Sequence, residues 1–293
     1  MKAYLDCYPC FFKQILRTSR EVTVDERTIH EILVAFGRYL DRIPVDATPP
    51  EIGREVYRLI GEKTGTPDPY REIKKQCTRQ ALALYPRLKE RIAASEDRLL
   101  TAARLAIAGN VIDFGTDTRF DLTEDIENLL STKMAINHYP EFRRALEDSR
   151  KVLYLADNAG ETVFDRLLIE ELGKPVVYVV REKPVINDAV LQDALDAGLD
   201  EVAGIVSSGT DAPGTILRFC SPEFLSLLDT AELVISKGQG NYEGLSDEAL
   251  PVFFLLRAKC EVIARDIGAE EGGLVLMKAK NFNAPTNPTR SRT

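Results

Sequence analysis

Polar and charged side chains follow several short apolar runs in the second half of the sequence. Carboxylates occur after four of these runs, and Arg or Lys side chains occur after three. The segments that follow the runs are 157–161, 181–188, 207–211, 237–243 and 257–259. Carboxylates that converge with basic side chains suit a divalent cation that bridges to an anionic ligand. The pattern therefore favours one shared functional site over a set of unrelated turns.

Histidine is too scarce to supply a metal site. The chain contains only His30 and His138, and neither has a second histidine at the spacing of metal ligands. A catalytic metal would therefore be bound mostly by oxygen atoms, which favours Mg²⁺ or Mn²⁺ over zinc.

The apolar runs predict the elements that would bring these side chains together. The runs are VLYLA (152–156), VVYVV (176–180), EVAGIV (201–206), ELVIS (232–236), VFFLL (252–256) and LVLM (274–277). They alternate with segments of helical periodicity, which predicts βαβ units and a mostly parallel sheet in a three-layer α/β/α sandwich. Because ligands bind outside the carboxyl ends of the strands in such sheets, the polar residues after each run are expected to meet.

The first half of the chain is predicted to be helical. Ile29, Ile32 and Phe36 recur at three- and four-residue intervals, which is typical of one buried helix face. The polar, proline-containing carboxyl terminus is expected to fray. We therefore expect a helical amino-terminal region at 1–150, an α/β/α domain at 151–280 and a flexible tail at 281–293.

A helical pattern runs through 99–112, and Ser95 is its expected start. Ser95 precedes two acidic residues, as at many helix starts. Asn110 and Asp113 lie beside Gly109 at the expected helix end, where a simple interpretation is a capping cluster.

Charge and hydropathy exclude several classes of partner. The net charge is −8 and the basic residues are scattered, so the sequence has no basic cluster of the kind that binds nucleic acids. No run approaches the ~18 apolar residues of a membrane span, and Asp6 interrupts any secretory signal, so we expect a cytoplasmic protein. A small phosphorylated ligand remains compatible with this charge, because one local pocket can be positive. The oligomeric state is not predicted.

The five cysteines do not suggest a disulfide framework, because their number is odd and the chain is large. Cys7 and Cys10 form a single Cys-x-x-Cys, which is compatible with half of a metal site, a redox pair or two buried small side chains. A second pair would be needed to indicate zinc. Cys77 could add a third thiolate only if the fold brings it close.

Three familiar kinds of site do not fit the sequence. The turn after the first run has the single glycine Gly160, whereas dinucleotide and methyl-donor sites need a Gly-rich turn. Lys237 is followed by Gly-Gln-Gly rather than arranged as a P-loop. The aspartyl-phosphate enzymes of the haloacid dehalogenase type carry a second Asp where this chain has Ala159.

Five motifs in order resemble those of the damage-control phosphatase family, and in particular its Cys-x-x-Cys-bearing subfamily of archaeal and bacterial proteins. The motifs are Cys7-Tyr-Pro-Cys10, Gly109-Asn110-Val-Ile-Asp113-Phe114, Asp157-Asn158-Ala-Gly-Glu161, Lys183-Pro184-Val-Ile-Asn187-Asp188 and Lys237-Gly-Gln-Gly-Asn241-Tyr-Glu243. Each motif is short, but together they span nearly the whole chain. The resemblance implies a helical amino-terminal region, an α/β/α catalytic domain and phosphatase activity on small metabolites, either sugar phosphates or normal or damaged nucleotides.

The resemblance also implies a metal site. The family's cation is bound by an Asp-Asn pair and a later Asp, which correspond to Asp157, Asn158 and Asp188 in this chain. The ions that the family suggests are Mn²⁺, Ni²⁺, Co²⁺ and Mg²⁺. Lys259 resembles the family's basic residue near the carboxyl terminus, although Ala258 departs from the pattern of another subfamily.

The remaining motif residues receive supporting roles. Lys237, Lys259 and the backbone near Ser208 and Thr210 are predicted to bind phosphate, because basic groups and free amides stabilise phosphoryl charge. Glu161 is a candidate general base or a support for the metal ligands. The family match favours a substrate-facing or supporting role for Asn110 and Asp113. Asn241 and Glu243 belong to the last of the matching motifs, without a specific role. The attacking group could be water or a carboxylate.

Two other functions remain open from the sequence. The fold would permit a methyltransferase, which the missing Gly-rich turn disfavours. A non-catalytic protein that binds phosphorylated metabolites would carry the same pocket. Release of inorganic phosphate from a phosphomonoester distinguishes the three.

Overall fold

A computed structural model describes residues 1–109 and 122–283. Within this part of the chain a seven-stranded sheet has the order β1-β7-β6-β5-β2-β3-β4. The strands are β1 Ile136–Asn137, β2 Val152–Leu155, β3 Val176–Val180, β4 Gly204–Ser207, β5 Val234–Lys237, β6 Val252–Arg257 and β7 Leu274–Lys278. Strands β2 to β6 run parallel, and β7 pairs antiparallel with β6. The prediction of a mostly parallel α/β sheet is confirmed.

Twelve α-helices accompany the sheet in the described residues. They are α1 Cys7–Val22, α2 Glu26–Tyr39, α3 Pro49–Thr64, α4 Arg71–Ala93, α5 Arg98–Ala108, α6 Leu122–Ser131, α7 Tyr139–Asp148, α8 Thr162–Leu172, α9 Leu191–Asp196, α10 Pro222–Asp229, α11 Gln239–Leu245 and α12 Glu261–Ile267. None of the described helices is long and apolar enough to cross a membrane.

The sheet is covered on both faces because its strands are apolar on both sides. In β2, Val152 and Tyr154 pack into one core with α5, α7 and α8, whereas Leu153 and Leu155 pack into the opposite core with α10, α11 and α12. Successive side chains of a strand point to opposite faces, so an unbroken apolar run requires helices on each side. The result is the expected α/β/α sandwich.

Strand β2 lies where the order of the sheet reverses. It pairs with β3 on one side and with β5 on the other. The chain proceeds from β2 to β3 and β4 in one direction and from β5 to β6 in the other. A crevice forms at such a switch point, outside the carboxyl ends of the strands. The loops after β2, β3 and β5 meet at this crevice.

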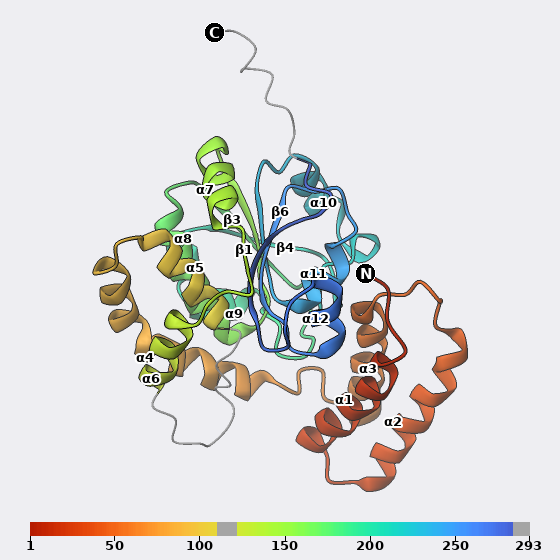
Figure 1. Ribbon diagram of the computed structural model, residues 1–293. Helices are drawn as coiled ribbons and strands as arrows, with labels where there is room; N and C mark the ends of the chain where they lie inside the picture. Colours follow the sequence, from red (N-terminus) through yellow and green to blue (C-terminus); the bar gives the residue numbers. More distant parts are fainter. Residues whose placement is uncertain (110–121, 284–293) are drawn as a thin grey trace.

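Helices α1, α2 and α3 form a separate helical subdomain beside the sheet (Figure 1). They bury Phe11, Ile32, Phe36 and Val56 in a core of their own. Helix α2 begins where the Asp25 side chain accepts hydrogen bonds from two first-turn amides. This capping satisfies amides that would otherwise have no partner.

The expected division at residue 150 does not follow the packing. Helices α4 to α7, which all precede residue 150, include residues of the same core as the sheet, and β1 pairs with β7 through Ile136 and Val275. Periodicity identified helices but not the surface against which they pack. Two element ends also differ from expectation: β5 includes Lys237, and α5 starts after Asp97, whose side chain caps it in place of Ser95.

Candidate metal and phosphate site

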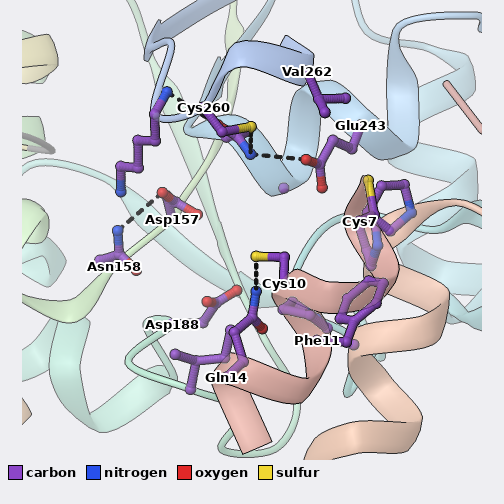
Figure 2. A pocket seen from close by; sticks show the side chains of 18 of the residues that line it. Cys7, Cys10, Phe11, Gln14, Asp157, Asn158, Asp188, Glu243, Cys260 and Val262 are labelled. Carbon is purple, nitrogen blue, oxygen red and sulfur yellow. Dashed lines mark hydrogen bonds between the residues drawn. The ribbon is translucent and has the colours of Figure 1, made fainter. Parts of the chain in front are cut away.

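Two backbone hydrogen bonds join the loop after β2 to the loop after β3. The amide of Ala159 donates to the carbonyl of Asn187, and the amide of Ala189 donates to the carbonyl of Asp157, each over 2.8 Å. The Asp157 and Asp188 side chains consequently line one pocket at the carboxyl ends of the strands (Figure 2). The structure therefore brings together two carboxylates that follow successive strands of the sheet.

The amide of Asn158 is oriented by its acidic neighbours. Its Nδ2 donates to Oδ2 of Asp157 over 3.0 Å and to Oε1 of Glu161 over 2.6 Å. An ionised carboxylate only accepts hydrogen bonds, so these contacts fix which end of the amide carries the nitrogen. Both amide hydrogens are used in this way. The Oδ1 oxygen is thus the end of the side chain available to a cation.

The carboxylates at this site repel one another. Burial, with the negative charges of Glu161 and Asp188, raises the pKa of Asp157 to about 8, and the positive charges of Lys259 and Arg181 oppose this rise. Burial also raises the pKa of Asp188, against the neighbouring Arg181 guanidinium. Closely spaced negative charges in a buried setting are what a bound divalent cation would stabilise.

Arg181 holds Asp188 in place. Its Nε donates to Oδ2 of Asp188 over 2.8 Å, while its other nitrogens donate to Thr215 over 3.2 Å and to Asn241 over 2.9 Å. Asn241 in turn donates to the carbonyls of Ala156 and Lys237 at the ends of β2 and β5. Arg181 and Thr215 were not among the predicted site residues, although Arg181 directly follows a predicted strand.

Lys237 does not reach the pocket. Its ammonium is fully buried and donates to Oε2 of Glu161 over 2.8 Å and to Oδ1 of Asp165 over 2.7 Å. Asp165 also accepts hydrogen bonds from the hydroxyls of Tyr154 and Tyr178. Lys237 is the last residue of β5 rather than the first of the following loop, so it points into the core. The expectation that it binds phosphate is corrected: it neutralises Glu161 beneath Asn158.

The Glu161 carboxylate likewise holds neighbouring side chains in position. Its two oxygens accept hydrogen bonds from Asn158 and Lys237. Glu161 lies at the end of a short 3₁₀ segment, Ala159–Glu161, directly before α8. Of its two predicted roles, these contacts favour support of the metal ligands.

Ser208 and Thr210 are also buried away from the pocket. The hydroxyl of Ser208 donates to the carbonyl of Val180, and the hydroxyl of Thr210 accepts from the amide of Ala212. Neither residue is among the described residues that line the pocket. Their hydrogen bonds secure the loop after β4, so the two residues do not lie where the prediction required them for phosphate binding in this pocket.

Lys259 is the basic side chain of the predicted set that does line the pocket. It follows β6, and its side chain is exposed. Lys259 and Asp157 line the same pocket, and the positive charge of Lys259 opposes the rise in the pKa of Asp157. An exposed ammonium beside the carboxylates is well placed to meet an anionic ligand.

Gly238 makes room for Asp157. It has φ 77° and ψ 167°, a region of backbone conformation used almost only by glycine. A Cβ atom at this position would lie 1.9 Å from Oδ2 of Asp157. The carboxylate therefore occupies the space that any other side chain would need.

The residues present fit a hard divalent cation. Two carboxylates and one amide oxygen are ligands of the kind that Mg²⁺ and Mn²⁺ prefer. Among the described residues, no three Asp, Glu, His or Cys side chains are gathered so that they could hold a metal by themselves. The proposed set therefore depends on the Asn158 oxygen, whose orientation the neighbouring acids impose.

Comparison with known proteins identifies the family. Residues 3–275 match the damage-control phosphatase ARMT1-like domain. The chain belongs to this family. A damage-control phosphatase of Archaeoglobus fulgidus is 34% identical over 282 residues, which cover 92% of this chain and 96% of that protein. An uncharacterised protein of Methanocaldococcus jannaschii is 35% identical over 286 residues, which cover 93% and 94%.

A solved structure shows the same fold. The crystal structure of a DUF89 family protein from Pyrococcus horikoshii superposes with a TM-score of 0.90 at 32% identity, and the match covers 96% of this chain and all of that chain. A relative from the same organism is named a damage-control phosphatase. The resemblance stated from the sequence motifs is thereby confirmed.

The opposite wall of the pocket comes from the helical subdomain. Helix α1 contributes Cys7, Cys10, Phe11 and Gln14, and α3 contributes Pro49 with its neighbours. The cavity has a volume of about 280 Å³. Although remote in sequence from Asp157, the two cysteines share its pocket.

Of three further motif residues, the structure describes one. Glu243 lines the pocket from α11, and burial raises its pKa to about 7. Asn110 and Asp113 lie outside the described residues, so their predicted role stays a prediction.

Proposed function

We propose that this protein is a metal-dependent phosphatase that hydrolyses phosphomonoesters of small metabolites, either sugar phosphates or normal or damaged nucleotides. Family membership and the names of two relatives support a damage-control phosphatase. The observation that carries the proposal is the pocket in which Asp157, Asn158 and Asp188 face one another beside Lys259.

Each of these residues has a distinct task in the proposed reaction. Asp157, Asn158 and Asp188 would hold the cation, which when bound polarises the phosphoryl oxygens and neutralises their charge. Lys259 donates a charge-assisted hydrogen bond to a phosphoryl oxygen, an interaction that strengthens as charge develops on the phosphoryl group. Arg181 keeps Asp188 fixed, and Glu161 keeps the Asn158 oxygen turned towards the cation.

The far wall of the pocket receives the rest of the substrate. Phe11, Pro49 and Pro50 lie across the cavity from the carboxylates, and Ile186 and Val262 add further apolar surface. An apolar wall excludes water and contacts the part of the substrate that leaves with the ester oxygen. The helical subdomain thus governs which phosphomonoester binds, whereas the sheet provides the groups that act on phosphate.

The test is phosphate release after removal of bound metal. Chelated protein is assayed with p-nitrophenyl phosphate, alone and with Mn²⁺, Co²⁺, Ni²⁺ or Mg²⁺. We expect turnover only with added cation, and loss of that turnover in Asp157→Ala and Asp188→Ala at saturating metal. Asp200→Ala is the matched control, because Asp200 is an exposed aspartate that does not line the pocket.

Two outcomes would contradict the proposal. Wild-type turnover in either folded pocket variant would remove that residue as a ligand. Binding of phosphate without release of phosphate from any ester, with every cation, would instead support a non-catalytic binding protein.

A further inference from the structure

The proposed phosphatase reaction makes no use of the thiols in the pocket. Cys7 and Cys10 lie on the first turn of α1, and Cys260 precedes α12 on a neighbouring part of the wall. Figure 2 shows Cys10 reaching into the pocket from α1, with Asp157 and Asp188 facing it. Three of the five cysteines of the chain therefore surround one cavity, and all five are free thiols.

The spacing of Cys7 and Cys10 is close to what a disulfide needs. Residues three apart on a helix have Cβ atoms about 5–6 Å apart, and a disulfide requires about 3.5–4.5 Å. The Asp6 side chain does not cap the first turn of α1, and the amides of Cys7 and Tyr8 bond outside the helix, to the carbonyls of Tyr4 and Leu5. A local shift of this turn would be enough to close the bond.

The two thiols have different surroundings. Cys10 is exposed, and its Sγ accepts a hydrogen bond of 3.4 Å from Nε2 of Gln14. The Gln14 amide is itself fixed, because its Oε1 accepts a hydrogen bond of 3.2 Å from the Tyr57 hydroxyl. Cys7 is half-buried, and burial together with the charge of Glu243 raises the pKa of its thiol. Cys10 is thus the accessible thiol whose sulfur receives a donor, and Cys7 is the shielded one.

The thiols do not have the arrangement of a complete metal site in the described residues. Among the described residues, Cys7, Cys10, Cys260 and Glu243 do not form a group placed to hold a metal ion. Covalent chemistry between neighbouring thiols requires no such arrangement.

We propose that Cys7 and Cys10 form a reversible disulfide on the wall of the substrate pocket, by exchange with a low-molecular-weight disulfide. The Cys10 thiolate attacks one sulfur of that compound, which forms a mixed disulfide and releases one thiolate. The Cys7 thiolate then attacks Sγ of Cys10 and releases the second thiolate. The protein loses two electrons and two thiol protons, and the small disulfide becomes two thiols.

The bond would change the wall that contacts the leaving group. Closing it draws Sγ of Cys10 towards Cys7 and away from the Gln14 amide, which alters α1 beside Phe11. The metal ligands belong to the loops after β2 and β3, and they do not move with α1. Oxidation is therefore expected to raise KM severalfold for a phosphomonoester and to change Mn²⁺ affinity little. This second effect rests on the proposed function, whereas formation of the disulfide does not.

The experiment uses the full chain in buffers of reduced and oxidised glutathione, followed by thiol counting and peptide mapping by mass spectrometry. We expect oxidised wild-type protein to lose two free thiols and to contain a peptide that joins Cys7 to Cys10, both restored by dithiothreitol. Cys10→Ser removes the linked peptide, and Cys77→Ser, on a cysteine outside the pocket, keeps it.

Three results would overturn the proposal. These are a stable glutathione adduct on Cys10 that never closes, a bond between Cys7 and Cys260, and unreacted thiols in folded protein. An unchanged KM in the oxidised, linked protein would refute the effect on the pocket. If the chain hydrolysed no phosphomonoester with any cation but the linked peptide formed, the proposed function would fail and the disulfide would stand.

Discussion

Replacing Gly238 by alanine tests the geometry of the metal site through a residue that provides no ligand. Gly238 has φ 77° and ψ 167°, and holding another residue in this region of backbone conformation costs about 1–3 kcal/mol. The added Cβ would also lie 1.9 Å from Oδ2 of Asp157, whereas real Cβ atoms essentially never approach another atom within 3.0 Å. One of the two groups must therefore move by at least 1.1 Å, the difference between 3.0 and 1.9 Å.

A movement of that size is large for a metal ligand. Ligand distances in metal sites vary by only about 0.2 Å, and a misplacement of about 1 Å can reduce a reaction rate about 100-fold. We therefore expect Gly238→Ala to lose most of its Mn²⁺ affinity and about 100-fold or more in kcat/KM. The free energy of unfolding should fall by about 1–3 kcal/mol. Calorimetric titration with Mn²⁺, phosphate release and denaturant unfolding measure the three quantities.

Gly173→Ala is a control that introduces backbone strain without a steric clash. Gly173 ends α8 with φ 63°, and an added Cβ there meets no atom within 4 Å. This variant should lose about 1–2 kcal/mol of stability through backbone strain and keep its Mn²⁺ affinity. If Gly238→Ala bound Mn²⁺ and turned over like Gly173→Ala, the close approach of Asp157 to this glycine would have no role in the site.

Three further substitutions test the roles assigned to charged residues. Lys259→Met should lower kcat/KM and leave Mn²⁺ affinity nearly unchanged; a structure with vanadate bound and the Lys259 ammonium far from it would contradict this. Lys237→Met should reduce the free energy of unfolding by about 3–5 kcal/mol, because it leaves Glu161 and Asp165 as buried, uncompensated charges. An unfolding midpoint equal to that of the wild type would refute the role of Lys237 in neutralising these two carboxylates. The pKa of Glu243 is raised to about 7 from 4.5, so its ionisation should remove stability as pH rises from 4.5 to 7, by up to roughly 3 kcal/mol. Glu243→Gln should remove this decline in chemical unfolding at pH 5 and 8, and an unchanged pH dependence would show that another group causes it.

The strands were predictable because burial on both faces leaves a direct trace in the sequence. The run at 176–180 corresponds to β3 residue for residue, since every position of a central parallel strand must be apolar. The helical subdomain was predictable as helices only. Phe36 and Leu146 both lie on amphipathic helices, yet one packs in the subdomain core and the other against the sheet. Periodicity shows that a face is buried but not what covers it.

The site was predictable to the extent that it follows the ends of strands. Asp157 and Asp188 lie just beyond two strands and share the pocket. Lys237 was misplaced because one residue decides whether a side chain belongs to the strand or to the loop after it. Its partner Asp165 comes from the helix after β2, and only the fold shows that pairing. The sequence around Cys10 does not indicate that α1 lines the cavity that contains Asp157 and Asp188.

The most direct test of the account is a crystal of the metal-loaded protein with vanadate, in which Mn²⁺ is located by its anomalous scattering. The account predicts one strong peak bound by carboxylate oxygens of Asp157 and Asp188 and by Oδ1 of Asn158, with Lys259 in contact with vanadate. A peak at the Cys7 and Cys10 thiols, or a Mn²⁺ ion bound without either aspartate, would contradict it.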